Sequence, residues 1–296
     1  MAPPLLRVRA AAILFVTVII TSAAKLSECA RIFTIVNGCK EKVWPGILPA
    51  NNSNGEGGGF SLKPGQSAVY TAPPGWSGRI WGRTGCNFDK SGNGTCETGG
   101  CGNSLNCTGP GKPPSSIAEF TLGGGGGSQL DYYDVSLVDG LNLPIVVMPR
   151  NGTGNCSAAG CDKDPRQNCP SELAAKSRDG KIAACRSACN VFNTDEYCCR
   201  GMYGNPLACK PSNYSKIFKE ACPVAYSYAY DDPTSILTCS APDYIVTFCA
   251  SRNQTVCSYH DNHLVCNGSK ALATVSQRWR VLLASLFIIN FQIKFY

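Results

Sequence analysis

The chain has 296 residues, of which 19 are cysteine and 31 glycine, and only 16% of its residues are charged. Cysteine at this density, without repeated CxxC pairs, is typical of proteins that fold in an oxidising compartment. The formal net charge is +7, but residues 1–30 carry +2 of it and residues 270–296 carry +4, so the part between them is nearly neutral at +1. Near-neutrality excludes the broad basic surface of a nucleic-acid-binding protein.

The N-terminus has the pattern of a secretory signal peptide. Two arginines precede an apolar run that is too short to span a membrane, and small residues follow it. Cleavage after Ala24 satisfies the small-residue rule and leaves Cys29 in the mature chain. Cleavage after Ala30 leaves an even number of cysteines but puts Glu28 at the third position before the cut. We favour Ala30, which predicts a signal peptide over residues 1–30.

Short β-rich runs separated by Gly, Pro and Asn follow the signal peptide. Strand alternation puts Arg79, Trp81 and Arg83 on one face of their run, and Asp139–Gly140 is a turn signal within the longest run. Many short strands with this punctuation predict a β-sandwich or barrel. The runs cover residues 31–39, 42–47, 61–73, 78–85, 117–122, 131–149 and 243–249.

Two cysteine-rich stretches interrupt these strands. Residues 82–107 hold four cysteines among Gly, Asn, Ser and Thr, so this run has little apolar surface to bury and needs cross-links to order it. Residues 156–222 hold nine cysteines. Here residues 171–176, 181–192 and 213–222 are predicted to be helical, which would put two cysteines of the second helix one turn apart.

The catalytic motifs of common enzyme classes are missing from the sequence. It has no G-x-S-x-G elbow, Walker loop or dinucleotide fingerprint, and both histidines follow the predicted core, which excludes a Ser–His or Cys–His mechanism within it. Cys257, His260, His263 and Cys266 have a spacing that could ligate zinc. In a secreted chain we favour a Cys257–Cys266 disulfide instead, and we expect no metal and no cofactor.

Carboxylates are the remaining candidates for chemistry. Glu119 stands in a strand whose other residues are apolar or small. Asp134 and Asp139 are five residues apart, so a straight strand would send them to opposite faces, and they can share a cleft only if Asp139 lies beyond the strand end. Asp231 and Asp232 form an acidic pair before a proline. Ordinary turn chemistry explains these Asp-Gly and Asp-Asp-Pro motifs equally well.

The C-terminus carries a polar extension over residues 251–269 and an apolar tail over residues 270–296. A small site at Asn267–Gly268–Ser269, a spacer and a short apolar tail match a signal for attachment of a GPI anchor. Basic residues close to or inside the tail argue against that signal, and the alternative is a tail that is poorly ordered or simply removed.

The run GNGTCETGGCGNSLNC at residues 92–107 resembles the signature of the thaumatin-like proteins, pathogenesis-related family 5. The resemblance extends from about Phe33 to Cys249, with Gly100 where that family usually has Asp. It implies a mainly β fold with a thaumatin-like β-sandwich core, a disulfide-rich helical lobe and a small β-ribbon lobe. The core would comprise residues 31–83, 115–162 and 223–250, the ribbon lobe residues 84–114 and the helical lobe residues 163–222 of a domain spanning residues 31–250.

The resemblance also implies eight disulfides, to which we add Cys257–Cys266. The implied pairs are Cys39–Cys249, Cys86–Cys96, Cys101–Cys107, Cys156–Cys239, Cys161–Cys222, Cys169–Cys185, Cys189–Cys198 and Cys199–Cys209.

Antifungal members of the family have an acidic cleft made of one Arg, one Glu and three Asp. This sequence has a residue at each matching position: Arg79, Glu119, Asp134, Asp139 and Asp232. If the cleft hydrolyses glycosidic bonds, Glu119 is expected to act as the acid and Asp139 or Asp134 as the nucleophile or base. Arg79 would hold the carboxylates together by charge pairing.

The resemblance implies a secreted, apoplastic plant defence protein of the antifungal type that binds β-1,3-glucan of fungal walls as a monomer. Alternatives are a weak endo-β-1,3-glucanase that uses the same cleft, or a GPI-anchored interaction protein at the plasma membrane or cell wall. Some glycosylation is expected. The sequons lie at Asn51, Asn93, Asn106, Asn151, Asn155, Asn213, Asn253 and Asn267, two of them with a middle cysteine that makes them doubtful acceptors.

Overall fold

The computed structural model describes residues 30–51, 57–124, 129–232, 234–260 and 263–266. Residues 1–29 of the predicted signal peptide and the C-terminal tail lie outside these residues, and the signal peptide, its cleavage site and the tail's role stay predictions. Of the helices in the described segments, none combines the length and the apolar character needed to cross a membrane.

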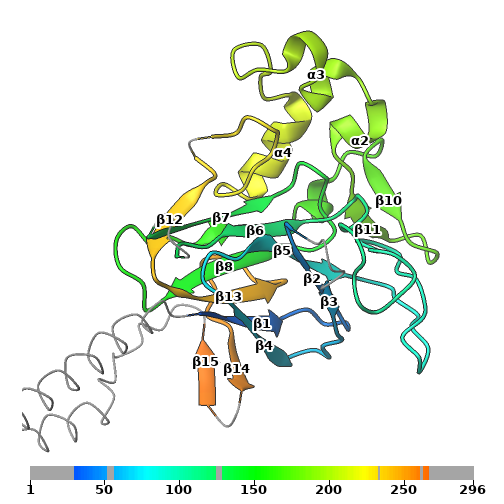
Figure 1. Cartoon of the computed structure of the whole chain (residues 1–296). Coiled ribbons are helices and arrows are strands. Elements are labelled where there is room, and N and C mark those ends of the chain that lie inside the picture. The colour runs from blue at the N-terminus through cyan, green and yellow to red at the C-terminus, as the bar shows by residue number, and fades with distance from the viewer. Residues whose placement is uncertain (1–29, 52–56, 125–128, 233, 261–262, 267–296) are drawn as a thin grey trace, which may run out of the picture.

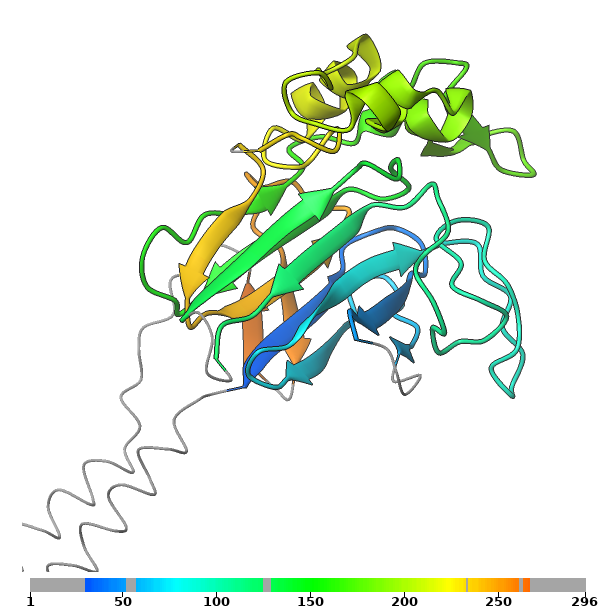
Figure 2. The same ribbon diagram turned by 45° about the horizontal axis from the view of Figure 1, so that its top comes forward.

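Two β-sheets pack face to face and form a sandwich, as predicted (Figures 1 and 2). In the described segments, neighbouring strands are antiparallel, with the exception of the parallel pair β1 and β13. The first sheet has the order β4 (Ser67–Ala72), β1 (Arg31–Asn37), β13 (Asp243–Phe248), β8 (Ile145–Arg150) and β9 (Ala159–Gly160). The second has the order β12 (Leu237–Ser240), β7 (Leu130–Ser136), β6 (Ile117–Thr121), β5 (Ser77–Arg83), β2 (Trp44–Pro49) and β3 (Gly58–Gly59).

The core between the sheets is built from the alternate residues of each strand that point inward. Phe33 of β1 stacks on Tyr244 of β13 with ring centroids 5.1 Å apart, and Phe120 of β6 meets the edge of Phe33 at 4.9 Å. These buried rings from both sheets lock the two layers together.

A buried ion pair adds a polar link between the layers. Arg31 Nε lies 3.0 Å from Asp131 Oδ2, and the Tyr244 hydroxyl donates to the same oxygen at 3.1 Å. The Gly123 N–H donates to Asp131 Oδ1 at 2.8 Å. Because a buried carboxylate is costly unless it is paired and hydrogen-bonded, these contacts hold the start of β1 against β7.

The described cysteines form nine disulfides, and the pairs are the same nine that the sequence analysis expected. Cys39–Cys249 joins residues 210 positions apart at the two ends of the core. Cross-links over such long stretches restrict the unfolded chain most.

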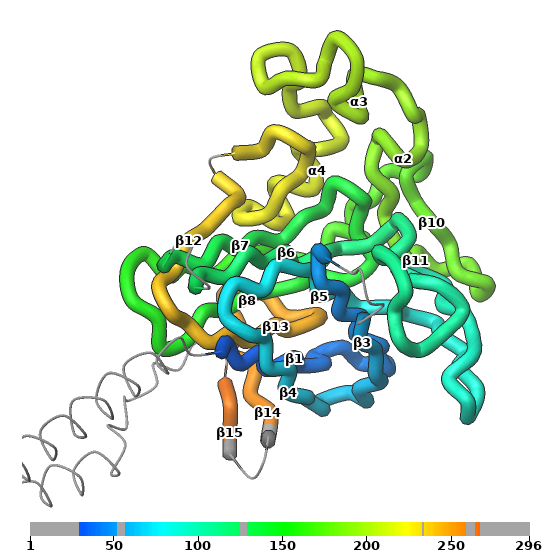
Figure 3. The backbone as a smooth tube through the Cα atoms, in the orientation of Figure 1, coloured from blue at the N-terminus to red at the C-terminus, as the bar shows by residue number. Residues whose placement is uncertain are grey.

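The loop lobe (residues 84–114) lies beside β2 and β3, as the trace in Figure 3 shows. Within this lobe, which the resemblance implied to be a small β-ribbon, the strand pairing consists of two isolated bridges, Thr84 to Thr98 and Asn93 to Ser104. Trp81 anchors the lobe, because its indole N–H donates to the Gly99 carbonyl at 2.8 Å. The lobe thereby covers one end of the outer face of the six-stranded sheet.

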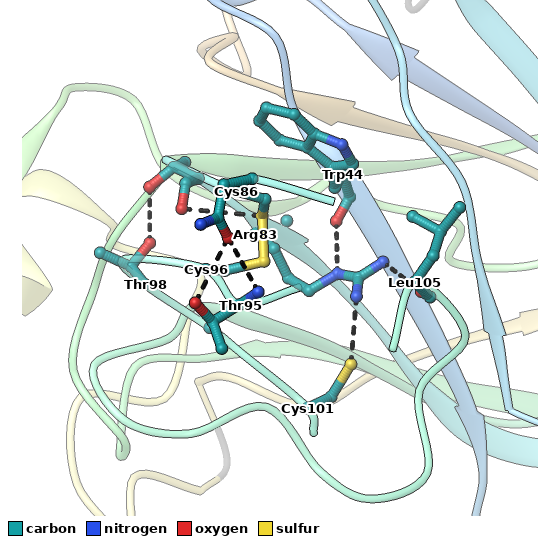
Figure 4. The surroundings of a disulfide bond; sticks show 12 residues. Trp44, Arg83, Cys86, Thr95, Cys96, Thr98, Cys101 and Leu105 are labelled. Carbon is teal, nitrogen blue, oxygen red and sulfur yellow. Dashed lines mark hydrogen bonds between the residues drawn. A yellow bond between two sulfur atoms is a disulfide. The ribbon is translucent and has the colours of Figure 1, made fainter. Parts of the chain in front are cut away.

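Arg83 is fully buried and forms a second anchor for the loop lobe (Figure 4). Its guanidinium donates to the carbonyls of Trp44 and Leu105 at 3.0 and 2.7 Å and contacts Cys101 Sγ at 3.3 Å. Further bonds go to the carbonyls of Pro45 and Ser104. Burial lowers its pKa to about 10, so the guanidinium is charged at neutral pH.

The helical lobe (residues 163–222) stands above the outer face of the six-stranded sheet (Figure 2). One predicted helix is confirmed, since α4 covers Asn213–Ala221 with Ser212 as its N-cap. The elements of the helical lobe are η1 (Pro165–Asn168), β10 (Ala174–Lys176), β11 (Ile182–Cys185), α2 (Ala188–Phe192), α3 (Asp195–Cys198), η2 (Gly201–Tyr203) and α4.

Of the other two helix predictions in this lobe, the one over residues 171–176 is wrong and the one over residues 181–192 holds only for its second part. Residues 171–176 form a turn and then β10, which pairs with β11 in a hairpin. Within residues 181–192 the helix begins only at Ala188, after the N-cap Ser187. Cys185 is extended because it pairs with Leu141 and is bonded to Cys169. Tertiary pairing has overridden local helix propensity here.

A hairpin of β14 (Cys257–His260) and β15 (His263–Cys266) lies against β4 at the bottom of Figure 1. A disulfide joins Cys257 to Cys266, so these sulfurs are bridged and cannot act as the thiolate ligands of a zinc site.

Candidate functional site

Three charged side chains lie in a row across the middle of the six-stranded sheet. The strand register places Arg79 of β5 opposite Glu119 of β6, and Glu119 opposite Asp134 of β7. Their sequence neighbours Ile80 and Val135 point into the core, so this charged row points to the outer face.

The charged row forms the floor of a cleft of about 330 Å³ between the sheet and the segment that follows the helical lobe. Two backbone hydrogen bonds fix that segment against β7. The Tyr226 N–H donates to Val135 O and the Leu137 N–H donates to Tyr226 O, both at 2.8 Å. The residues that line the cleft are Arg79, Ile117, Glu119, Asp134, Ser136, Val138, Asp139, Tyr226 and Ala229.

Asp139 reaches this cleft because it lies beyond the end of β7, as the sequence analysis required. Residues 138 and 139 form a turn that Gly140 completes with a φ of 89°, and the Gly140 N–H donates to Leu137 O at 2.9 Å. A side chain at position 140 would have its Cβ only 2.7 Å from the Cys185 carbonyl oxygen. This turn allows Asp134 and Asp139 to line one cleft despite their odd separation.

Asp232 is exposed and acts on the cleft through a neighbour. The Tyr226 hydroxyl donates a short hydrogen bond to Asp232 Oδ1, and Tyr226 lines the cleft while Asp232 does not. The charge of Asp232 is one of the causes that raise the pKa of Asp134. Four of the five expected site residues thus line the cleft, and the fifth is linked to it.

The carboxyl groups of the cleft differ in their tendency to ionise. Burial, together with the charges of Glu119 and Asp232, raises the pKa of Asp134 to about 8, against the opposing effect of Arg79. Asp134 Oδ1 is buried and has no hydrogen-bond partner within the described part of the chain. Burial also raises the pKa of Asp139, again opposed by Arg79.

Glu119 is in a different situation because it has a cationic partner. Arg79 Nε lies 2.7 Å from Glu119 Oε1, and the two side chains are 47% and 32% exposed. At neutral pH the floor of the cleft therefore combines an ion pair with a protonated carboxyl group. Such a surface offers both hydrogen-bond donors and acceptors.

The structure adds residues that the sequence analysis did not name. Tyr226 lines the cleft and holds Asp232, but no sequence motif marks it. Asp231, the other half of the acidic pair, points away and accepts hydrogen bonds from Lys219 Nζ at 3.0 Å and from the Ser227 N–H and hydroxyl at 2.8 Å. Of the two adjacent aspartates, one therefore holds the loop and the other reaches the cleft rim.

In the described residues, no group of three or more His, Cys, Asp or Glu side chains is arranged to hold a metal ion. In the cleft, the charge of Arg79 opposes the rise in the pKa of Asp134 and of Asp139.

The comparisons with known proteins agree with the fold. The crystal structure of a laminaripentaose-producing beta-1,3-glucanase in complex with laminaritetraose aligns with a TM-score of 0.53 and 13% identity, over 75% of this chain and 99% of that one. At this identity the likeness shows a shared fold.

Sequence relatives are much more similar. A "Thaumatin-like protein" of Arabidopsis thaliana is 58% identical over 216 residues, which cover 72% of this chain and 87% of that protein. A "Pathogenesis-related thaumatin-like protein 3.5" of Cryptomeria japonica is 56% identical, over 75% of this chain and 91% of that protein. The model of the thaumatin family matches residues 37–250. This chain therefore belongs to the thaumatin family.

Proposed function

We propose that this protein is a secreted plant defence protein that binds β-1,3-glucan of fungal walls through the cleft. The observation that carries the proposal is the charged row of Arg79, Glu119 and Asp134 on the floor of that cleft. The relatives named pathogenesis-related support the defence role, and the nine disulfides support an oxidising, extracellular location.

A neutral polyhydroxylated ligand suits the chemistry of the cleft. Sugar hydroxyls both donate and accept, and the cleft supplies the carboxylate of Glu119 in its ion pair with Arg79, the carboxyl group of Asp134, whose pKa burial raises to about 8, and the phenol of Tyr226. A glucanase with the same fold was solved with laminaritetraose, which makes β-1,3-linked glucose the first ligand to test.

Weak hydrolysis of the same glucan is the second candidate function. A glycosidase needs one protonated and one ionised carboxyl group at the scissile bond, and the raised pKa of Asp134 beside Glu119 favours this arrangement. Burial points to Asp134 as the proton donor, whereas the sequence analysis assigned that role to Glu119. The assignment of Glu119 as the acid stays a prediction.

One experiment tests both candidates. The mature protein is incubated with insoluble β-1,3-glucan, and with cellulose as a control, and both the pelleted protein and the released reducing ends are measured. We expect binding to β-1,3-glucan that is weakened in Glu119→Gln and Asp134→Asn and unchanged in Asp179→Asn, whose carboxylate is exposed in the helical lobe.

The outcomes separate the candidates. Binding without sugar release identifies a wall-binding protein. Release that is lost in Glu119→Gln or Asp134→Asn identifies a hydrolase. Absence of both binding and release by the wild type would rule out the glucan proposal. The predicted GPI anchor has its own test, which is release of the protein from plant membranes by phospholipase C.

A further inference from the structure

A second row of side chains crosses the outer face of the six-stranded sheet, two residues along the strands from the charged row. The register places Ser77 opposite Thr121, Thr121 opposite Tyr132, and Tyr132 opposite Thr238. Ser77 Oγ and Thr121 Oγ1 are 3.2 Å apart, and Tyr132 is 39% exposed. We call these four residues the hydroxyl row.

The hydroxyl row borders the charged row on one side. On the other side lies the buried row of Trp81, Ile117 and Ser136, of which Ile117 and Ser136 line the cleft. Along the strands the outer face therefore passes from this buried row, through the charged row, to the more exposed side chains of the hydroxyl row. A linear ligand that lies along the strands and outgrows the cleft on this side would extend over the hydroxyl row.

The size of the cleft makes such an overhang necessary for a polymer. Its volume of about 330 Å³ is at the lower end of the range for pockets that hold a single small molecule. Residues two apart on a strand are separated by about 6.6 Å. The next ring of a chain that fills the cleft would thus lie over Thr121 and Tyr132.

We propose that the hydroxyl row is a second subsite, in which the ring of Tyr132 stacks on a pyranose of the same glucan chain that occupies the cleft. The inference rests on the proposed glucan-binding function and deepens it. A pyranose presents C–H groups on its flat faces, which are attracted to the negative face of an aromatic ring. Its hydroxyls lie around the edge, where Ser77, Thr121 and Thr238 can donate or accept.

A single exposed aromatic side chain is ordinary on a protein surface and would carry no such inference. Phe192 of α2 is 38% exposed too, but it lies in the helical lobe, where it packs against Tyr197 and Tyr214. Tyr132 differs because its strand register makes it continuous with the cleft floor, on the same face and two residues from Asp134. Phe192 is therefore the matched control, as an aromatic residue of equal exposure that does not line the cleft.

The test measures affinity as a function of ligand length. Soluble β-1,3-linked glucose oligomers of increasing length are titrated into the mature protein by calorimetry. For the wild type we expect affinity to rise until the oligomer spans both subsites. Tyr132→Ala should lower the affinity for the longest oligomer by about tenfold, the scale expected from the apolar area of one ring, and leave that for the shortest bound oligomer unchanged.

Two further variants guard against a folding artefact. Tyr132→Phe keeps the ring and should bind as the wild type does, whereas Tyr132→Thr keeps strand propensity and should behave like Tyr132→Ala. Phe192→Ala should have no effect at any length. Thermal unfolding of each variant shows that it is folded.

The results distinguish this inference from the function on which it rests. If the wild type binds no oligomer and no insoluble glucan, the proposed function fails and the subsite with it. If the wild type binds but the Tyr132 variants lose nothing, or lose affinity equally at every length, the second subsite is refuted while glucan binding stands.

Discussion

Glu119 and Asp134 face each other across β6 and β7, and the guanidinium of Arg79 forms its ion pair with Glu119, 2.7 Å away. Two ionised carboxylates directly opposite each other on neighbouring strands repel. The arginine offsets one charge, and protonation of the more buried Asp134 removes the other. The cleft thereby keeps two carboxyl groups side by side at neutral pH.

Glucan binding should depend on pH through Asp134. Below a pH of about 8 its carboxyl group is protonated and can donate a hydrogen bond to a sugar hydroxyl. We expect affinity for insoluble β-1,3-glucan to be constant from about pH 5 to 7 and to fall several-fold as the pH rises through 8. The amide of Asp134→Asn can donate a hydrogen bond at every pH, so this variant should bind more weakly than the wild type but with an affinity that does not fall near pH 8. If its affinity falls in the same way, a group other than Asp134 causes the pH dependence.

The free energy of unfolding should also depend on the protonation of Asp134. Its pKa is raised in the folded state, from 3.8 to about 8, so folding favours the protonated form. The stabilisation is complete below a pH of about 4 and is lost as the pH rises through 8. Relative to Asp134→Asn, the wild type should lose on the order of a few kcal/mol of unfolding free energy between about pH 5 and 9. Denaturant unfolding at several pH values measures this difference, and parallel pH profiles would contradict it.

The sequence was most informative where strand alternation decides the outcome. The alternation of side chains along a strand correctly placed Arg79, Trp81 and Arg83 on one face of β5. It also required Asp139 to lie beyond the strand end if it was to share a cleft with Asp134. It could not tell that Arg79 would be open to solvent while Arg83 is fully buried, because the cover over Arg83 comes from a loop lobe with no secondary-structure signal of its own.

Local propensity was least reliable in the helical lobe. Residues 171–176 and 181–192 were predicted to be helical, yet residues 174–176 and 182–185 pair as strands, and Cys185 is held by its disulfide to Cys169 and its pairing with Leu141. Spacing alone gives no disulfide pairing, and the pairs came from the resemblance. Tyr226 was missed because its place in the cleft follows from a backbone bridge to β7, a long-range contact without a local signal.

The ion pair of Lys219 and Asp231 should be essential for the shape of the cleft wall. Lys219 Nζ contacts Asp231 Oδ2 at 3.0 Å, Ser235 Oγ at 2.9 Å and Ala225 O at 3.0 Å, and the two side chains are 27% and 12% exposed. Lys219→Met leaves a largely buried carboxylate without its cation, so we expect a loss of about 3 kcal/mol in unfolding free energy. Glucan binding should weaken too, because Tyr226 lies in the same loop.

The control for this prediction is Lys181→Met, which breaks the exposed pair with Asp179 and should change neither property measurably. A double variant, Lys219→Met with Asp231→Leu, should recover part of the stability because no buried charge is left unpaired. Equal stability of Lys219→Met and the wild type would show that the pair contributes little.

Arg83 should determine whether the loop lobe stays closed. Its guanidinium donates to carbonyls of both β2 and the loop lobe, including Trp44 O at 3.0 Å and Leu105 O at 2.7 Å (Figure 4). Arg83→Met fills similar space but leaves these buried carbonyls without donors, at a cost of about 1–3 kcal/mol each.

The disulfides Cys86–Cys96 and Cys101–Cys107 still close the loops of the lobe in this variant, so we expect local opening rather than global unfolding. Limited proteolysis should cut within residues 84–114 of Arg83→Met much faster than in the wild type or in Lys112→Met, which removes an exposed cation from the same lobe. Equal resistance of all three would show that Trp81 and the disulfides alone hold the lobe.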